Sequence, residues 1–391
     1  MSSDEAGTTS SPAAPPLEDD DLLSEILLRL PPQPSSLPRA SAVSKCWRSL
    51  ASDPRFCSRF RSHHRRNPPL LGCFVKFFDD FHFTSTLDAP NRIPPSRFSV
   101  PIHAGDSFRP LGCRHGLALI LSPKNQLLVW DPITGGQHRL GIPPAFDADA
   151  SWISAAVLRP AAAGDIQHFQ VVLVGNSDMH RRKAVASVYS SDTGVWGNLI
   201  TVQLPPDDPS VNQYNPAVMA GDSLYWLISG DIYGILEFDL DRQSLSLIPV
   251  PGDEIHWWEG VGNISVTSLE DGGLGFLILS KFSAQLWKRK MDCDGVSSWL
   301  LERTIALDKL LSINSEWATE HPFILGFAEN NNVVLLRTST GVFAVQLESL
   351  QFKKVFDYNN WHGFYPFEVV YTADNSIGGA HDGAELPKNI K

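Results

Sequence analysis

A single sequence plan recurs along most of this chain, and this repeat restricts the possible folds more than any other feature. Each copy has an apolar segment, a turn, a second apolar segment, a polar turn and a third segment. The five copies span residues 116–140, 169–199, 223–248, 274–301 and 332–355. The second segments end at five equivalent positions, which are Trp130, Tyr189, Phe238, Trp287 and Val345. Successive positions lie 59, 49, 49 and 58 residues apart, and units of about fifty residues with three or four strands are typical of β-propeller blades.

Two further strand-like segments, 70–83 and 364–372, flank the five copies and belong to none of them. Pairing them in one sheet would close the ring of blades and remove exposed sheet edges. We therefore expect a six-bladed propeller over residues 70–372, with five or seven blades as the alternatives. A β-sandwich would show shorter and more even spacing between turns.

Residues 17–60 have the apolar spacing of helices and predict three short ones. The first begins at the acidic cluster around Asp20, which complements the positive end of the helix dipole, and it stops at Pro31. The second begins at Ser35 or Ser36 and continues to about residue 50, with an apolar stripe at Leu37, Ala40, Val43, Trp47 and Leu50. The third begins at the capping pair Asp53 and Pro54. Three helices of this size enclose little core, so we expect some of their apolar residues to face a partner.

The same segment resembles an F-box. The matching elements, in chain order, are Leu17-Glu18, Asp19-Asp20, residues 22–27, Leu30-Pro31, residues 42–48 and residues 53–56. Glu18 replaces the usual opening proline, and Ser44 stands where cysteine is common, but neither change removes an apolar anchor. The resemblance implies docking on the Skp-type adaptor of an SCF ubiquitin ligase. The residues that it assigns to this contact are Leu17, Leu22, Leu23, Ile26, Leu27, Leu30, Pro31, Leu37, Val43 and Trp47. Any helical bundle would also use such residues in its core, so the sequence does not sort internal from external ones.

The whole chain resembles plant-type F-box proteins that carry an associated propeller. The expected fold is therefore α+β and multidomain, with a three-helix F-box followed by an all-β propeller. The expected boundaries are a disordered tail at 1–16, the F-box at 17–60, a linker at 61–69, the propeller at 70–372 and a flexible tail at 373–391.

Two aromatic clusters in expected propeller loops are the candidate target-binding residues. They comprise Trp257 and Trp258 before the fourth copy, and Trp361 and Tyr365 after the fifth. Aromatic side chains dominate interface hot spots. The alternative is that these rings fill the space between blades.

The sequence carries no recognisable catalytic, cofactor or metal motif. Gly272-Gly273-Leu274-Gly275 lacks the spacing and the lysine of a phosphate-binding loop, and G-x-S-x-G and H-E-x-x-H are absent. His115, in Arg114-His115-Gly116, is expected to bond neighbouring backbone. The five cysteines are widely spaced with no C-x-x-C pair, which favours reduced thiols and no metal site. We therefore expect no cofactor and no metal.

A net charge of −11 argues against binding of nucleic acid or of an anionic membrane. The chain has neither an apparent signal segment nor an apolar run of membrane-spanning length. We expect a cytoplasmic or nuclear protein.

The resemblance implies a non-catalytic substrate-recognition subunit of an SCF-type ubiquitin ligase. Its partners would be the Skp-type adaptor, a cullin scaffold through that adaptor, and an unidentified target protein. One alternative is a scaffold that binds the adaptor without delivering a target. Another is a propeller enzyme or ligand-binding module, which would need titratable residues converging on the central channel, and the sequence does not reveal these.

Overall fold

The computed structural model describes residues 20–78, 80–101, 108–122, 125–146, 153–159, 168–176, 183–205, 210–212, 215–230, 234–251, 263–313, 320–357 and 363–372. The chain divides into two compact units. One comprises Met1–Arg65 together with Val370–Lys391, and the other comprises Arg66–Val369.

The described part of the first unit contains four helices where the sequence predicts three. They are α1 (Asp20–Leu28), α2 (Ser36–Ser41), α3 (Lys45–Ala51) and α4 (Pro54–His63). The expected second helix is divided because Ser44 is extended, with φ −155° and ψ 170°, and its side chain accepts a hydrogen bond from the Trp47 backbone N–H at 3.2 Å. A serine in this conformation starts a new helix instead of continuing the old one. Ser35 precedes α2 but makes no capping side-chain bond.

The fourth helix begins at the cap that the sequence indicates. The Asp53 carboxylate accepts the Phe56 N–H at 3.1 Å, and Pro54 occupies the first turn. The helix continues to His63, so its last turn lies in the segment that the sequence assigns to the linker.

The core of the helical unit is a single apolar cluster. Its buried members are Leu23, Leu27, Leu28, Leu37, Ala40, Ala51, Phe56, Phe60 and Val370. Val370 comes from the far end of the chain, and Arg61 donates a hydrogen bond to Thr372 at 2.7 Å. Residues 370–372, which the sequence places in the propeller, therefore pack with the helices.

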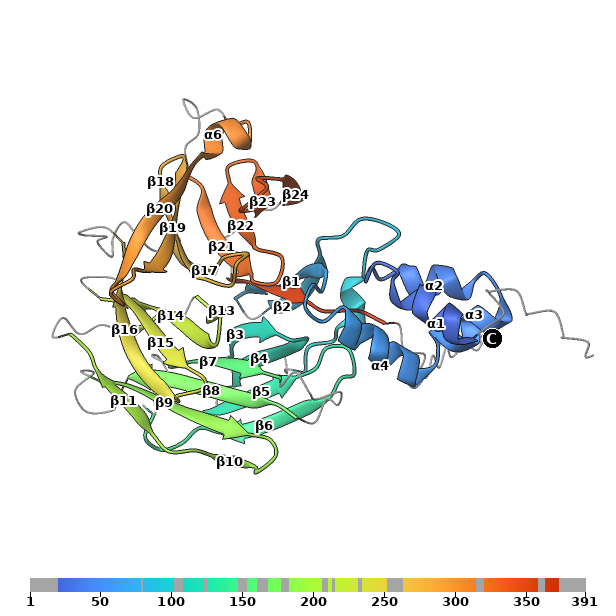
Figure 1. Cartoon of the computed structure of the whole chain (residues 1–391), viewed down its shortest axis with the longest axis horizontal. Coiled ribbons are helices and arrows are strands. Elements are labelled where there is room, and N and C mark those ends of the chain that lie inside the picture. The colour runs from blue at the N-terminus through green and yellow to red at the C-terminus, as the bar shows by residue number, and fades with distance from the viewer. Residues whose placement is uncertain are drawn as a thin grey trace, which may run out of the picture. The chain divides into compact units, whose positions relative to one another are not determined.

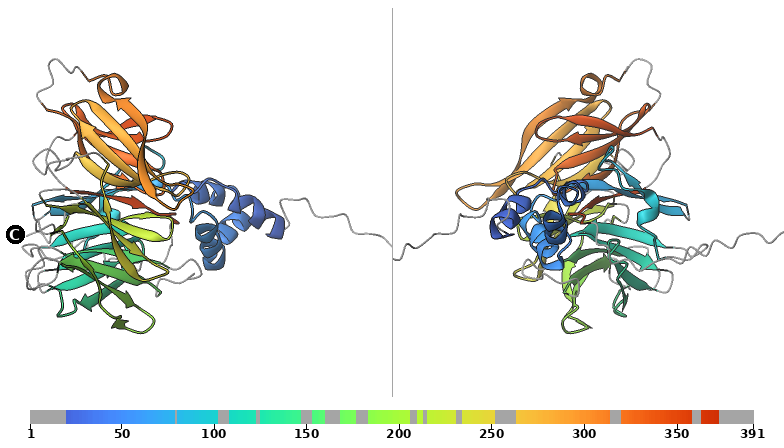
Figure 2. Two further views of the ribbon diagram at one scale, coloured as in Figure 1. Left: turned by 60° about the vertical axis from the view of Figure 1, so that its left-hand side comes forward. Right: turned by 90° about the vertical axis from the view of Figure 1, so that its right-hand side faces the viewer.

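The second unit is built from six antiparallel sheets, which are the six blades (Figures 1 and 2). The first blade comprises β3 (Arg109–Arg114), β4 (Leu117–Ser122), β5 (Gln126–Trp130) and β6 (Gln137–Gly141). The second comprises β7 (Ile153–Leu158), β8 (Gln170–Asn176), β9 (Lys183–Ser190), β10 (Val195–Trp196) and β11 (Ile200–Gln203). The third comprises β12 (Ser210–Val211), β13 (Val218–Ala220), β14 (Ser223–Ser229), β15 (Gly234–Asp239) and β16 (Ser244–Pro249).

The fourth and fifth blades have four strands each, and the sixth has three. The fourth comprises β17 (Ile264–Ser268), β18 (Leu274–Ser280), β19 (Ser283–Met291) and β20 (Ser297–Ala306). The fifth comprises β21 (Phe323–Ala328), β22 (Val333–Thr338), β23 (Gly341–Gln346) and β24 (Phe352–Phe356). The sixth comprises β1 (Leu70–Phe77), β2 (Asp80–Ser85) and β25 (Gly363–Glu368). The short helices η1 (Pro95–Arg97) and α6 (Leu307–Leu310) lie in connections.

The five repeat positions are structurally equivalent, as predicted. Each lies on the third strand of its blade, counted outward from the axis. Each pairs with a residue near the start of the second strand, as Trp130 does with Ala118 and Phe238 with Leu224. Trp130 and Phe238 are buried in the cores between blades. The sequence did not identify the innermost strand of these blades, so each predicted copy begins at the second strand.

The sixth blade closes the ring by the predicted pairing of early and late strands. Strand β25 pairs antiparallel with β1, with Phe74 opposite Tyr365, and Figure 1 shows the two side by side. The innermost strands of neighbouring blades also contact one another around the ring, including β21 with β25 and β25 with β3. The six-bladed fold is confirmed.

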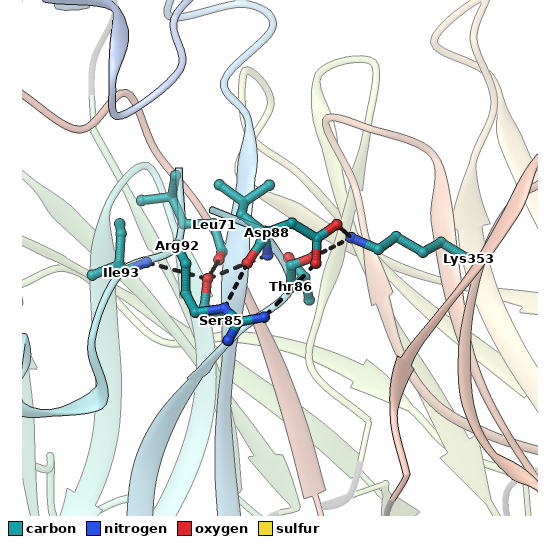
Figure 3. Close-up of polar contacts among 8 residues, drawn as sticks. Leu71, Ser85, Thr86, Asp88, Arg92, Ile93 and Lys353 are labelled. Carbon is teal, nitrogen blue, oxygen red and sulfur yellow. Dashed lines mark hydrogen bonds and ion pairs between the residues drawn. The ribbon is translucent and has the colours of Figure 1, made fainter. Parts of the chain in front are cut away.

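A polar contact joins the last strand of the fifth blade to the segment after β2 in the sixth blade (Figure 3). Lys353 on β24 donates to the Thr86 carbonyl at 3.2 Å and pairs with the Asp88 carboxylate, both of which follow β2. The Ser85 hydroxyl donates to the Leu71 carbonyl at 3.1 Å, which holds the same segment against β1.

The third blade contains a buried tyrosine whose ionisation should weaken the fold. The Tyr225 hydroxyl on β14 donates to Glu237 on β15 at 2.9 Å, and Ser246 on β16 donates to the other oxygen of Glu237 at 2.7 Å. Burial, with the Glu237 charge, raises the pKa of Tyr225 to about 12. A raised pKa means that the stabilisation is complete below the unfolded value of about 10 and is lost as pH rises from there to about 12.

We predict that Tyr225→Phe removes part of the alkaline loss of stability. Between pH 8 and pH 11 the free energy of unfolding of the native chain should fall by about 1 kcal/mol more than that of the variant. Urea unfolding at the two pH values measures this difference. Tyr189→Phe, at a half-buried position, is the control and should behave like the native chain.

Candidate functional site

In the helical unit, some of the residues assigned to the adaptor contact are buried in the core and others are exposed. Leu23 and Leu27 are fully buried and Leu37 is 6% exposed, so these three belong to the core of the unit. Leu22 is 43% exposed and Val43 is 63% exposed. Pro31 is also exposed, whereas Ile26, Leu30 and Trp47 are half-buried. Leu17 lies outside the described residues.

Val43 corrects one feature of the predicted helical stripe. The sequence places it on the inner face of a continuous second helix, but it lies in the turn between α2 and α3. Because Ser44 ends the helical path there, the Val43 side chain points away from the core. Leu22 and Val43 are thus two exposed apolar side chains on a small unit, as expected of a docking module.

Polar contacts hold the helices of this unit together. Arg59 on α4 pairs with Glu25 on α1 at 3.0 Å and donates to the Ser24 hydroxyl at 3.1 Å. His64 contacts the Leu28 carbonyl at 2.9 Å, and burial lowers its pKa. This contact fixes the end of α4 against the end of α1.

The propeller unit has a central channel with a cavity of 490 Å³. Residues from the innermost strands of all six blades line it, together with the end of β1. Most of the wall is apolar, contributed by Leu111, Leu119, Ala155, Val157, Val218 and Leu325.

One end of the channel, which we call the inner end, carries a buried ion pair between blades. Arg114 at the end of β3 binds the Glu329 carboxylate through Nε, at 3.1 Å, and through Nη2. The same Nη2 donates to the Ala217 carbonyl beside β13 at 2.9 Å. The side chains of Arg114 and Glu329 are only 7% and 19% exposed. Three blades are therefore joined through one guanidinium group.

A second carboxylate, Glu368, lies at the inner end with its own donors. Asn330 donates its backbone N–H and its side-chain amide at 3.2 and 3.0 Å, and Asn331 does the same at 2.9 and 2.6 Å. Burial raises the pKa of Glu368, and these donors act in the opposite direction. The sequence did not indicate that Arg114, Glu329 and Glu368 converge here, because each lies at or just after the end of a different innermost strand.

The other end of the channel, the outer end, combines aromatic rings with two cations. The Lys76 ammonium lies over the Phe108 ring at 3.5 Å from its centroid. Arg109, the first residue of β3, donates to the Ile153 carbonyl at 2.8 Å. The Phe77 and Phe78 rings are 4.6 Å apart, and Phe78 is 81% exposed with φ 47°.

Tyr365 is the only one of the four candidate target-binding residues that the structure describes. It lies within β25 and not in a loop, is 6% exposed and lines the channel. Burial raises the pKa of its hydroxyl, while the nearby positive charge of Arg109 opposes this shift. Trp257, Trp258 and Trp361 lie outside the described residues.

His115 has the structural role that the sequence suggests. Its Nδ1 accepts the Arg159 backbone N–H at 3.1 Å. Across the described ranges, no three His, Cys, Asp or Glu side chains gather in a way that could hold a metal ion. None of the described helices combines the length and apolar character that crossing a bilayer requires.

Family models match both units of the chain. The F-box domain model matches residues 19–59, and the model described as "F-box protein AT5G49610-like, beta-propeller" matches residues 111–373, which is more than half of the chain. The chain belongs to this family of F-box proteins with a β-propeller. Such proteins are typically non-catalytic adaptors, and F-box domains typically bind Skp1-type adaptors.

Curated relatives of this F-box protein occur in Arabidopsis thaliana. The F-box/LRR-repeat protein At2g43260 is 27% identical over 258 residues, covering 60% of this chain and 56% of the relative. The putative F-box protein At1g47765 is 45% identical over 67 residues, covering 17% and 16%. The chain thus aligns with about half of the first relative's length. Among solved structures, the WD40 domain of SCAP from fission yeast matches 70% of this chain and 58% of its own at 11% identity, with a TM-score of 0.35, too low to carry an argument.

Proposed function

We propose that this F-box protein is the substrate-recognition subunit of an SCF-type ubiquitin ligase. The observation that carries the proposal is the exposed apolar pair Leu22 and Val43 on a helical unit that the F-box model matches. Exposed apolar residues on a small unit gain stability when a partner covers them. The Skp-type adaptor would cover this surface and connect the chain to a cullin.

The protein would act by proximity and would perform no chemistry of its own. The propeller would bind a target protein, so that a separate conjugating enzyme meets the target's lysines at a high effective concentration. Reduced cysteines and an acidic composition support residence in the cytoplasm or nucleus, where the same ligases would operate. A fluorescent fusion observed in living cells tests this location.

Reconstitution tests the ligase proposal. We expect the full-length chain to form a 1:1 complex with a purified Skp-type adaptor on size exclusion, and this complex to recruit the cullin. Failure of the native chain to bind the adaptor at micromolar concentrations would refute the proposal.

A second measurement separates a ligase receptor from a scaffold that binds the adaptor without delivering a target. Proteins that co-purify with the propeller should accumulate in cells when the chain is depleted, and should be ubiquitinated in the reconstituted complex. Stable levels of every co-purifying protein would favour the scaffold.

A further inference from the structure

A residue from the far end of the chain completes the core of the helical unit. Val370 is a buried member of the apolar cluster that also contains Leu23, Phe56 and Phe60, and it is only 4% exposed. Four short helices enclose little core, so each buried side chain supplies a large share of the unit's stability. The loss of Val370 would leave a cavity in the middle of this cluster.

Thr372 adds a buried polar contact to the same unit. The residue is 2% exposed, and its hydroxyl oxygen accepts a hydrogen bond from Nη1 of Arg61 at 2.7 Å. Arg61 lies on α4, the helix that also supplies Phe56 and Phe60 to the cluster. Because a buried hydroxyl is costly to leave without a partner, this bond fixes the position of residues 370–372 on the helices.

The two segments by which the chain enters and leaves the propeller unit are tied together within that unit. The side-chain amide of Asn331 donates to the Pro68 carbonyl at 2.9 Å and to the Glu368 carboxylate at 2.6 Å. The Val369 backbone N–H donates to the Pro69 carbonyl at 3.3 Å. The chain therefore leaves the propeller unit beside the point at which it entered.

Closure of the propeller ring holds the segment that precedes Val370. Strand β25 ends at Glu368 and pairs with β1, and Val370 follows two residues later. A short free segment with one apolar side chain would not stay on the helices by itself, because each ordered residue loses conformational entropy. With Val369 already fixed in the closed ring, much less entropy remains to be lost when Val370 docks.

We propose that residues 370–372 are a C-terminal latch, which the closed propeller presents to the helices, and that the F-box reaches its stable, adaptor-binding form only with this latch docked. A chain whose propeller has not closed would then be a poor partner for the adaptor. Adaptor binding enters this inference through the proposed function, whereas the stability of the helical unit is independent of it.

Amide hydrogen exchange on the full-length chain tests the latch without any partner. Val370→Ala removes two buried methyl groups, so local opening of the helices should become more frequent and exchange in α1 and α4 about tenfold faster. Val369→Ala makes the same change one position earlier, at a half-buried residue of the propeller unit, and should leave exchange in α1 and α4 unaltered.

A second variant covers the case in which Val370→Ala does not fold. Thr372→Val keeps the shape of the side chain but removes the acceptor for Arg61, and exchange in α1 and α4 should become about threefold to tenfold faster. Unchanged exchange in α1 and α4 in the latch variants, or an equal increase caused by Val369→Ala, would overturn the proposal.

Adaptor binding provides the functional measurement. Val370→Asp places a charge in the apolar cluster and should weaken binding of the purified Skp-type adaptor at least tenfold, whereas Val195→Asp, the same change at a position that is 61% exposed, should not alter it. Equal affinity of Val370→Asp and the native chain would refute the requirement for the latch. If the native chain itself does not bind the adaptor, the proposed function fails, and hydrogen exchange alone decides whether the latch stabilises the helices.

Discussion

Replacing both Leu22 and Val43 with glutamate is expected to weaken binding of the Skp-type adaptor by at least a hundredfold while the helical unit stays folded. Both side chains are substantially exposed, at 43% and 63%, so their loss leaves the internal cluster of the unit intact. Covering a leucine and a valine with a partner contributes about 1.5 to 3 kcal/mol each. The variant loses this contribution and must also bury two carboxylates against an apolar surface. Titration calorimetry against the purified adaptor measures the effect, and circular dichroism verifies the fold.

The propeller offers a matched control for this double variant. Val195 and Leu199, in and after β10, are 61% and 48% exposed. Their replacement by glutamate makes the same chemical change at similar exposure and should leave adaptor affinity within twofold of the native value. Equal binding by both double variants would mean that Leu22 and Val43 do not contact the adaptor. Leu27 is unsuitable for such a test because it is fully buried, and a charge there would unfold the unit.

Replacing Glu329 with alanine is expected to lower the free energy of unfolding of the propeller by about 3 to 5 kcal/mol. Removing one partner of a buried ion pair leaves the other charge uncompensated, and Arg114 is only 7% exposed at the inner end of the channel. Among the described residues, the Ala217 carbonyl would still accept from this guanidinium, but a carbonyl cannot replace a carboxylate. Urea unfolding of the full chain, followed by tryptophan fluorescence, measures the change.

The double variant Arg114→Met, Glu329→Ala tests the cause. If an uncompensated charge is responsible, removing the guanidinium should restore at least half of the lost stability. If the loss comes instead from a cavity, the double variant should be no more stable than Glu329→Ala. Asp357→Ala is the control, because its pair with Lys354 is exposed and should contribute less than about 1 kcal/mol.

The sequence predicted the parts of this fold that depend on local pattern. The repeat identified equivalent positions such as Trp130 and Phe238, because each blade buries the same face of its third strand. The closure of the ring was predicted because segments 70–83 and 364–372 resemble strands and belong to none of the five copies of the repeat. The helix start at Asp53 followed from its capping side chain.

Local pattern failed where the structure depends on a residue's neighbours in space. The innermost strands of the first five blades fell between the predicted copies, although a strand such as β7 is as long and as apolar as the segments of the repeat. Their place at the axis depends on the assembly of the blades and not on local pattern. The predicted second helix was wrong at Ser44, because a capping serine overrides an apolar stripe when the following residues can bury their side chains in a separate helix.

The sequence alone indicated a helical unit and a propeller with six blades favoured, because both leave regular spacings of apolar and turn residues, and the resemblance of the helical segment pointed to an F-box. The tertiary structure alone decided which F-box residues are exposed and which charges meet in the channel. Leu22 and Leu23 are neighbours of the same type, and only packing against Phe56 and Phe60 buries one and leaves the other exposed. Arg114 and Glu329 are far apart in the chain, and only the arrangement of blades around a common axis brings their charges together.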